Sequence, residues 1–277
     1  MTQKISVVIP THNRSHLLSR SIQSVLNQAL PASEIIVVDD GSTDHTEKMV
    51  KLDFPNVIYH RQPWAGVSAA RNTGIRMTRY PWLAFLDSDD EWLKEKLAKQ
   101  WHAVRDNPNV KICHSDEIWI RNGTRVNPHR KHQKKGGWIF QHCLPLCAIS
   151  PSAALIHKTV FDAVGLFDES LPACEDYDLW LRITHRYPVL FINQPLIKKY
   201  GGHDDQLSKK HWGMDRFRID SIIRLLETHE LNTDDQQAAL RTLISKLTIY
   251  LNGAKKRNKQ QEIRHYQQLL DYYSEQQ

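Results

Sequence analysis

The first half of the chain alternates short runs of β-branched and aromatic residues with amphipathic segments. The apolar runs cover residues 5–10, 34–39, 57–60, 82–86 and 110–115. Apolar residues at helical spacing occupy residues 15–26, 66–77 and 94–106. Such alternation is typical of βα units around a mostly parallel sheet. We therefore predict an α/β fold in which helices flank this sheet.

The pattern changes in the last quarter of the chain. Residues 214–229, 233–251 and 262–273 form three helical patterns with short polar breaks. We predict an α/β domain over residues 1–208 and a helical C-terminal region over residues 209–277. These helices offer a surface through which copies of the chain could form a homo-oligomer.

The composition indicates a soluble, cytoplasmic protein. Apolar residues make up 40% of the 277 residues and charged residues 25%, and no apolar run reaches about 18 residues. The N-terminus lacks the pattern of a signal peptide. The four cysteines show no CxxC spacing, so we expect reduced thiols. Cys143, Cys147 and His142 provide only three neighbouring ligands for zinc, whereas structural zinc takes four.

The charge distribution argues against a nucleic-acid partner. The net charge is +6, but residues 121–135 contain six basic residues and no acid. Subtracting these six from the 37 Lys and Arg residues leaves 31, equal to the 31 Asp and Glu residues. A nucleic-acid-binding protein carries a basic face on its reading element. The segment is either a solvated loop or a weak contact for a phosphorylated acceptor or the inner face of a membrane. Its basic residues are Arg121, Arg125, Arg130, Lys131, Lys134 and Lys135.

Polar clusters follow three predicted strands, at residues 10–13, 39–44 and 87–90. Ligands of parallel α/β sheets lie at the carboxyl ends of strands, so we expect the clusters to form one site. Within the third cluster, Asp87 and Asp89 can share Mg²⁺ or Mn²⁺ with substrate phosphates. Alternatively, Asp89 or Asp90 caps a helix over residues 91–100. An aspartyl-phosphate phosphatase would also use such acids, but after its first strand rather than its fourth.

Six motifs together resemble the family 2 glycosyltransferases over residues 4–208. The first four are VVIPTHNR at 7–14, VVDDGSTD at 37–44, GVSAARNTG at 66–74 and LDSDD at 86–90. Two more, FDAVGLFD at 161–168 and EDYDLWLR at 175–182, resemble the acceptor side of the family. The resemblance implies a GT-A fold that transfers a sugar from a nucleotide-sugar with inversion. Residues 1–116 would be the Rossmann-like, nucleotide-sugar-binding half, and residues 117–208 the acceptor half.

The resemblance also assigns donor-binding roles by motif position. Thr11 and His12 would border the nucleoside, with His12 standing where the family often has tyrosine. Asp40 would accept a hydrogen bond from the base. Arg71 would lie near the diphosphate or form a salt bridge within the fold. The donor implied by the resemblance is a UDP-sugar.

Catalytic and metal roles follow from the remaining motifs. Asp87 and Asp89 would hold Mn²⁺ or Mg²⁺, which stabilises the charge of the leaving diphosphate. In some relatives a histidine at the place of His203 completes the metal shell; a structural role is the alternative. An attacking hydroxyl must lose its proton, and the resemblance assigns this base role to Asp176. The alternative for Asp176 is a favourable position in the first turn of a helix.

The predicted function is therefore an inverting glycosyltransferase in surface polysaccharide or lipopolysaccharide synthesis. Its partners would be a nucleotide-sugar and a glycan or glycolipid acceptor, with peripheral membrane contact through residues 121–135. The alternative is a non-catalytic scaffold protein on a degenerate transferase fold. Release of nucleoside diphosphate from a donor separates the two hypotheses.

Overall fold

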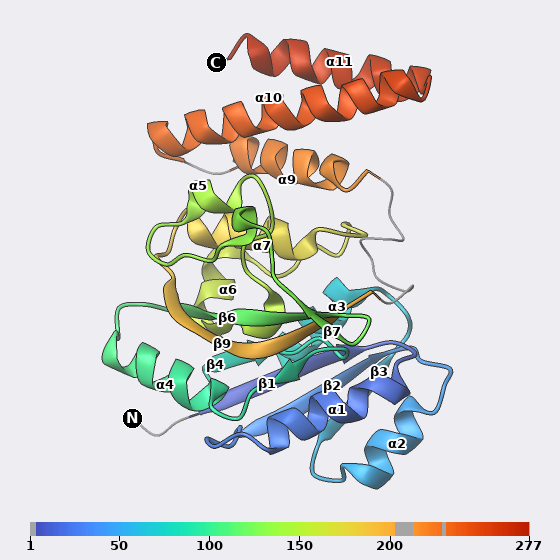
Figure 1. The fold of residues 1–277 in the computed structure, drawn as a ribbon, viewed down its shortest axis with the longest axis vertical. Coiled ribbons are helices and arrows are strands. Elements are labelled where there is room, and N and C mark those ends of the chain that lie inside the picture. The colour runs from blue at the N-terminus through green and yellow to red at the C-terminus, as the bar shows by residue number, and fades with distance from the viewer. Residues whose placement is uncertain (1–3, 203–212, 229–230, 277) are drawn as a thin grey trace.

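The computed structural model describes residues 4–202, 213–228 and 231–276 (Figure 1). Within these residues nine strands form one sheet in the order β3-β2-β1-β4-β8-β6-β9-β5, with β7 paired to β6. The strands are β1 (Ile5–Thr11), β2 (Glu34–Asp40), β3 (Ile58–Gln62), β4 (Trp82–Phe85), β5 (Glu91–Trp92), β6 (Ile112–Arg121), β7 (Thr124–Val126), β8 (Leu155–His157) and β9 (Leu190–Gly201).

The sheet is parallel over its first four strands and mixed beyond them. β3, β2, β1 and β4 pair in parallel, as do β6 and β9. β8 pairs antiparallel with both β4 and β6, and β5 pairs antiparallel with β9. Because β6 runs across residue 116, a single sheet spans the predicted donor and acceptor halves.

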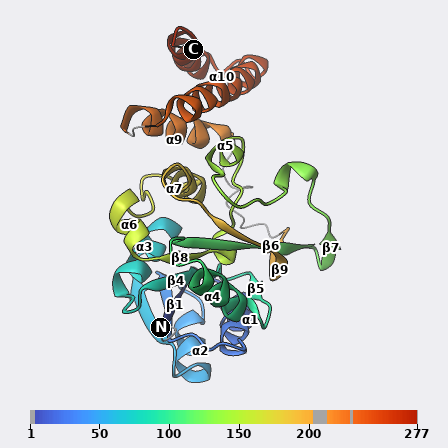
Figure 2. The same cartoon turned by 90° about the vertical axis from the view of Figure 1, so that its left-hand side faces the viewer.

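Two helical layers cover the sheet (Figure 2). One face packs against α1 (Ser15–Leu26), α2 (Thr46–Asp53) and α4 (Lys96–Asp106). The other packs against α3 (Val67–Met77), α5 (Phe140–Cys143), α6 (Thr159–Val164) and α7 (Glu175–Thr184). Alternation along β1 explains the two layers, because Val7 and Ile9 join the first buried cluster while Val8 joins the second.

The C-terminal helices extend the second layer, as the top of Figure 1 shows. They are α9 (Asp215–Thr228), α10 (Thr233–Lys256) and α11 (Gln260–Ser274). Ile222 of α9 and Leu243 of α10 belong to the same buried cluster as Trp180 of α7. The predicted helical region is therefore present, and its core is continuous with that of the α/β part. None of the described helices is long and apolar enough to cross a membrane.

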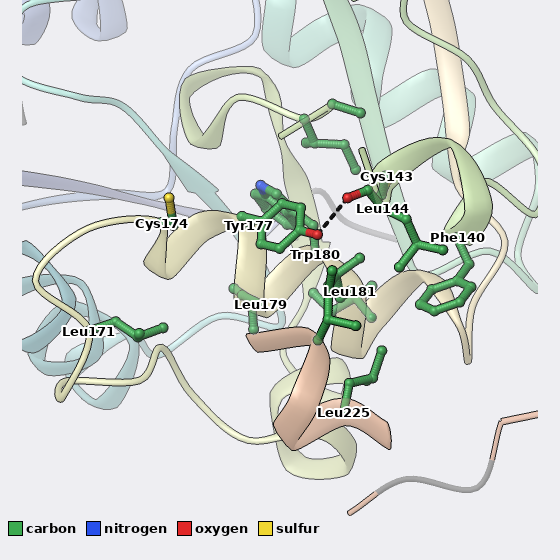
Figure 3. Close-up of a cluster of buried hydrophobic side chains, with 14 of the residues drawn as sticks. Phe140, Cys143, Leu144, Leu171, Cys174, Tyr177, Leu179, Trp180, Leu181 and Leu225 are labelled. Atoms are coloured by element: carbon green, nitrogen blue, oxygen red, sulfur yellow. Dashed lines mark hydrogen bonds between the residues drawn. The ribbon is translucent and has the colours of Figure 1, made fainter. Parts of the chain in front are cut away.

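A dense apolar cluster fixes α7 in this layer (Figure 3). Trp180 and Leu181 are each 1% exposed, and Leu225 of α9 packs beside them. The Tyr177 hydroxyl donates to the Leu144 carbonyl at 2.6 Å, the dashed line in Figure 3. Fully burying one such apolar side chain contributes about 1.5–3 kcal/mol, so this cluster sets the position of the first turn of α7.

Candidate active site

The carboxyl ends of three adjacent strands meet at one edge of the sheet. Thr11 of β1 stands in register with Asp39 of β2. Directly after β4, the Leu86 N–H donates to the Val8 carbonyl of β1 at 3.0 Å. The polar clusters that follow β1, β2 and β4 are thus brought together, as expected for neighbouring parallel strands.

The loops after β1 and β2 interlock around Asp40. His12 Nδ1 donates to the Asp40 carbonyl at 2.7 Å. The Asp40 carboxylate accepts from the Gly66 N–H at 2.7 Å, the Ala65 N–H at 3.0 Å and the Gln62 side chain at 2.8 Å. Two of these bonds end on Oδ1 and one on Oδ2, so Oδ2 retains a lone pair for a further donor. Asp40 therefore holds the loop between β3 and α3 in place.

Thr11 contributes an unsatisfied polar atom beside this loop. The residue is 4% exposed, and its buried Oγ1 has no hydrogen-bond partner in the part of the chain that the structure describes. A buried hydroxyl without a partner costs about 1–3 kcal/mol, and a ligand group that bonds it would remove that cost.

Arg71 forms a buried bridge between the donor and acceptor halves. Its guanidinium donates to Asp87 Oδ1 at 2.8 Å and to Glu175 Oε1 at 2.7 Å. Arg71 has only 4% of its side chain exposed and forms a salt bridge within the fold, while its place near a diphosphate stays a prediction. Burial alone would raise the pKa of Asp87, but Arg71 outweighs burial and holds that pKa below its usual value.

Asp89 and Asp90 have different surroundings although they are neighbours. Asp89 Oδ2 lies 3.0 Å from Arg14 Nη1. Asp90 is 2% exposed and accepts from the Ser152 hydroxyl at 2.6 Å and the Tyr200 N–H at 3.0 Å. Burial, followed by the charges of Asp89 and Asp87, raises the pKa of Asp90 well above its usual value. Asp90 is therefore a buried structural acid.

The alternative in which Asp89 or Asp90 caps a helix over residues 91–100 is wrong, whereas the helical pattern over residues 94–106 is present as α4. Glu91 and Trp92 pair with β9 as the short strand β5, and α4 begins only at Lys96. Trp92 is 3% exposed and its indole N–H donates to the Ser152 carbonyl at 2.9 Å. Burial of this side chain, together with pairing to Ile197, favours a strand over an early helical turn.

Asp87 and Asp89 suit a hard divalent ion that also binds phosphate oxygens. In the part of the chain that the structure describes, Asp87 Oδ2 accepts no hydrogen bond and is available to a metal. Mg²⁺ typically takes one or two carboxylates and completes its shell with phosphates and water. No group of three or more potential metal ligands gathers among the described residues. The third predicted ligand, His203, lies outside them.

Asp176 lies in the first turn of α7, one residue after the Arg71 partner Glu175. Asp176 Oδ1 accepts from the Tyr177 N–H at 2.7 Å, and Oδ2 accepts from the Cys147 thiol at 3.2 Å. Burial, followed by the Asp176 charge, raises the pKa of Cys147 well above its usual value, so this thiol stays protonated and donates. Asp176 is only half-buried, which leaves its carboxylate accessible to a substrate hydroxyl.

The three residues considered for zinc do not converge. The Cys147 thiol contacts Asp176, while His142 bonds the Gln133 carbonyl at 2.8 Å. Cys143 is 1% exposed within the apolar cluster. All four cysteines are free thiols, as the sequence predicted.

Comparison with known proteins identifies the family. A model of the Glycosyl transferase family 2 matches residues 6–165, more than half of the chain. The chain belongs to glycosyl transferase family 2. This membership confirms the prediction of a family 2 glycosyltransferase made from the sequence motifs.

Two curated family members illustrate the extent of the similarity. An uncharacterized glycosyltransferase of Rickettsia typhi is 30% identical over 199 residues, which cover 70% of this chain and 63% of that relative. This chain therefore spans less than two thirds of the length of that relative. The Escherichia coli UDP-Glc:alpha-D-GlcNAc-diphosphoundecaprenol beta-1,3-glucosyltransferase WfgD is 30% identical over 191 residues, covering 68% of this chain and 73% of WfgD.

Solved structures of glycosyltransferases confirm the GT-A fold. S. aureus TarS 1–349 in complex with UDP-GlcNAc has a TM-score of 0.66 and 16% identity, covering 99% of this chain and 93% of that chain. Mannosyltransferase PcManGT from Pyrobaculum calidifontis, in complex with GDP-Man and Mn²⁺, has a TM-score of 0.63 and 15% identity. It covers 91% of this chain and 75% of that chain. At such identities the likeness concerns the fold.

One cation near the acids of this site, Lys199 of β9, was not predicted from the sequence. Lys199 Nζ donates to the Ser150 hydroxyl at 3.0 Å. Burial alone would lower the pKa of Lys199, but nearby acids, led by Glu117 and Asp90, raise it, so the amine stays charged. The sequence signal was a pair of lysines inside an apolar run at 196–200, where a buried strand usually has none.

Proposed function

We propose that the chain is an inverting glycosyltransferase that moves a sugar from a nucleotide-diphosphate sugar to a hydroxyl of a glycan or glycolipid. The Arg71 bridge is the observation that carries this proposal. One buried guanidinium holds Asp87, at the strand ends, and Glu175, beside Asp176. The Arg71 ion pairs thus link Asp87, predicted to serve the donor, to the residue next to Asp176, predicted to serve the acceptor.

The strand ends would bind the donor. Thr11 and His12 would border its nucleoside, and the remaining lone pair of Asp40 would accept a base N–H. Asp87 and Asp89 would hold Mn²⁺ or Mg²⁺, which stabilises the negative charge of the departing diphosphate when bound. Arg14 and Arg71 pair with these two carboxylates and orient them. A UDP-sugar is the expected donor, supported by the donor that the name of WfgD contains and by the UDP-GlcNAc in the TarS complex.

Asp176 would accept the proton of the attacking hydroxyl. Its Oδ2 is held by a thiol, a weaker hydrogen-bond donor than a hydroxyl, so the carboxylate keeps capacity for the substrate proton. Attack from the face opposite the diphosphate gives inversion. Glu175 does not share this role, because its carboxylate is 5% exposed and paired with Arg71.

The acceptor would be a precursor of a surface polysaccharide or lipopolysaccharide. The name of WfgD contains a lipid-linked diphosphate acceptor, which supports a lipid-anchored substrate here. Residues 121–135 would then touch the inner face of the membrane. Lys134 is not part of this surface, because its side chain is 6% exposed and lies 3.2 Å from buried Glu117. The exposed cations are Arg121, Arg125, Arg130, Lys131 and Lys135.

A donor screen tests this function. Thermal shift with Mn²⁺ across UDP- and GDP-sugars should identify a donor, because a ligand raises stability by mass action. Release of nucleoside diphosphate from that donor, in the presence of an acceptor, then supports an enzyme. Donor binding with no release across a panel of acceptors supports the scaffold hypothesis instead.

The metal site has a separate test. Asp89→Ala should abolish the Mn²⁺-dependent part of UDP binding in calorimetry while the fold survives, because one of two metal carboxylates is lost. Asp106→Ala, which removes an exposed acid at the end of α4, is the matched control and should bind like the wild type. Unchanged, Mn²⁺-enhanced affinity in Asp89→Ala would move the metal site elsewhere.

A further inference from the structure

The edge of the sheet where the donor would bind has a large aromatic side chain nearby, Trp64, which has no role in the proposed function. Trp64 lies in the loop between β3 and α3 and is 66% exposed. The third family motif begins at Gly66, so Trp64 lies between two of the motifs. An exposed tryptophan alone is common on protein surfaces. The position of Trp64 relative to Asp40 is what indicates a function for this side chain.

The backbone of Trp64 is held against the second strand end. A Cβ at Gly41, where φ is +75°, would lie 2.8 Å from the Trp64 nitrogen, so the two backbones are in contact. The next two N–H groups, of Ala65 and Gly66, donate to the Asp40 carboxylate. His12 Nδ1 donates to the Asp40 carbonyl. Two residues with exposed rings, His12 and Trp64, therefore both contact the Asp40–Gly41 segment.

The exposure of the indole argues against a packing role. A core tryptophan of this chain such as Trp180 is 1% exposed, whereas Trp64 leaves most of its ring to solvent. The loop is held by Asp40 through backbone N–H groups and Gln62, none of which needs the indole. The side chain is thus dispensable for the loop and placed for a ligand.

We propose that Trp64 is the stacking platform of the nucleobase subsite, where its indole face covers the base of the donor. This inference rests on the proposed function, because it assigns a further residue to the same donor site. Aromatic stacking suits any base, since every base has a π-face, and removing one such contact costs about tenfold or more in affinity. Trp64 thereby supplies affinity for the base, while hydrogen bonding by Asp40 supplies selectivity between bases.

The test compares ligands with and without a base. UDP, GDP and inorganic diphosphate are titrated with Mn²⁺ into the full-length wild type, Trp64→Ala and Trp64→Phe, by calorimetry and tryptophan fluorescence. Trp64→Ala should weaken UDP and GDP about tenfold and leave diphosphate unchanged, while Trp64→Phe should recover most of the loss. The UDP-induced fluorescence change of the wild type should shrink in both variants. Trp138→Ala, at a tryptophan that is 69% exposed and lies just after residues 121–135, is the matched control and should bind UDP normally.

The remaining outcomes would overturn the inference in distinguishable ways. Equal affinity of Trp64→Ala and wild type for UDP means that the indole does not touch the base. Equal weakening of UDP and diphosphate means that Trp64 acts on the loop instead. If the wild type binds neither UDP, GDP nor diphosphate under any metal condition, the proposed function fails and this inference with it.

Discussion

Buried and exposed cations play different parts in this molecule. Arg71 and Lys96 are 4% and 0% exposed within the α/β core, whereas Arg125, Arg130 and Lys131 stand in solvent. Arg71 satisfies two carboxylates, while Lys96 donates to the Gln100 side-chain oxygen at 2.6 Å and lies over the Trp92 ring. Coulomb interactions are strong in the interior and screened at the surface. Buried cations therefore govern stability and geometry, and exposed ones can act only on charged partners.

The largest expected effect concerns the acid next to the Arg71 network. Asp176→Asn should keep donor binding but lose about 10²–10⁴ in turnover, the usual loss when a general base is removed. Steady-state kinetics with the true acceptor, together with donor calorimetry, measure the two effects separately.

Asp162→Asn is the matched control for Asp176→Asn. Asp162 is also an acid in the first turn of a helix, α6, but its side chain is exposed. If Asp176 serves only the helix dipole, both variants should turn over within a few-fold of the wild type. Such a result would assign the base role to another residue.

The next largest effect is on stability. Arg71→Met leaves the buried Glu175 and the partly exposed Asp87 without their shared cation, and breaking a buried pair this way costs about 3–5 kcal/mol. We expect that loss in the free energy of unfolding in urea. Ordinary domains have about 5–15 kcal/mol, so the variant should remain folded in buffer.

Arg79→Met shows how much of this effect depends on burial. Arg79 also pairs with a buried glutamate, Glu34 at 2.8 Å, but its own side chain is 67% exposed. Its loss should be clearly smaller, because Glu34 keeps a hydrogen bond from Ser6 and solvent screens the pair. Equal losses in the two variants would mean that burial of the arginine does not matter.

The sequence predicted the parallel strands and their ends because those signals are local. A run such as 34–39 contains its own β-branched residues, and neighbouring parallel strands must end at one edge. β6 extends beyond the predicted run of residues 110–115, and this outer part contains polar residues. It pairs because a distant group satisfies it, as Lys134 does for Glu117 at 3.2 Å. No local pattern reveals such a partner.

The site was predictable at the level of motifs but not of contacts. Arg71 meets Glu175 across 104 positions of sequence, and Cys147 meets Asp176 across 29. These contacts depend on how the segment before η2 (Pro151–Ala153) and the first turn of α7 pack, which composition and periodicity do not encode. A capping role for Asp89 or Asp90 failed for the same reason, because the pairing of Trp92 with β9 is a tertiary effect.

A pH effect separates Lys96 from Arg71. Burial lowers the pKa of Lys96 to about 7, against 10.5 for the ordinary side chain. Between pH 7 and 10.5, Lys96 is protonated in the unfolded chain and neutral in the folded chain. The free energy of unfolding therefore rises with pH in this range. Wild type should gain up to about 1.4 kcal/mol per pH unit from this group between pH 7.5 and 9.5. Lys96→Met should lack the gain, measured as the difference between the two proteins in urea unfolding.

Lys94→Met is the control for this pH effect, since Lys94 is exposed just before the same helix. Its stability should follow the wild-type pH curve in parallel. Other buried groups that titrate near pH 9 cancel in these differences. A constant difference between wild type and Lys96→Met across the window would contradict a lowered pKa for this lysine.

The smallest effect is expected from the exposed cations. Replacement of Arg125, Arg130, Lys131 and Lys135 by Gln should leave stability unchanged and weaken binding to anionic vesicles. Each basic side chain near such a surface contributes about 1 kcal/mol, and salt screens that contribution. Binding of wild type should therefore fall more steeply with salt than binding of the variant. Vesicle sedimentation at several salt concentrations measures both effects.

A second quadruple variant keeps the net charge equal and changes only the place of the lost cations. It replaces exposed residues distributed over other elements by Gln: Lys48, Lys94, Arg241 and Lys256. If overall charge alone attracts the protein to vesicles, the two variants should bind equally weakly. If the basic segment is the contact, only its own variant should lose affinity and salt sensitivity. Wild-type behaviour in both variants would leave residues 121–135 as solvated surface.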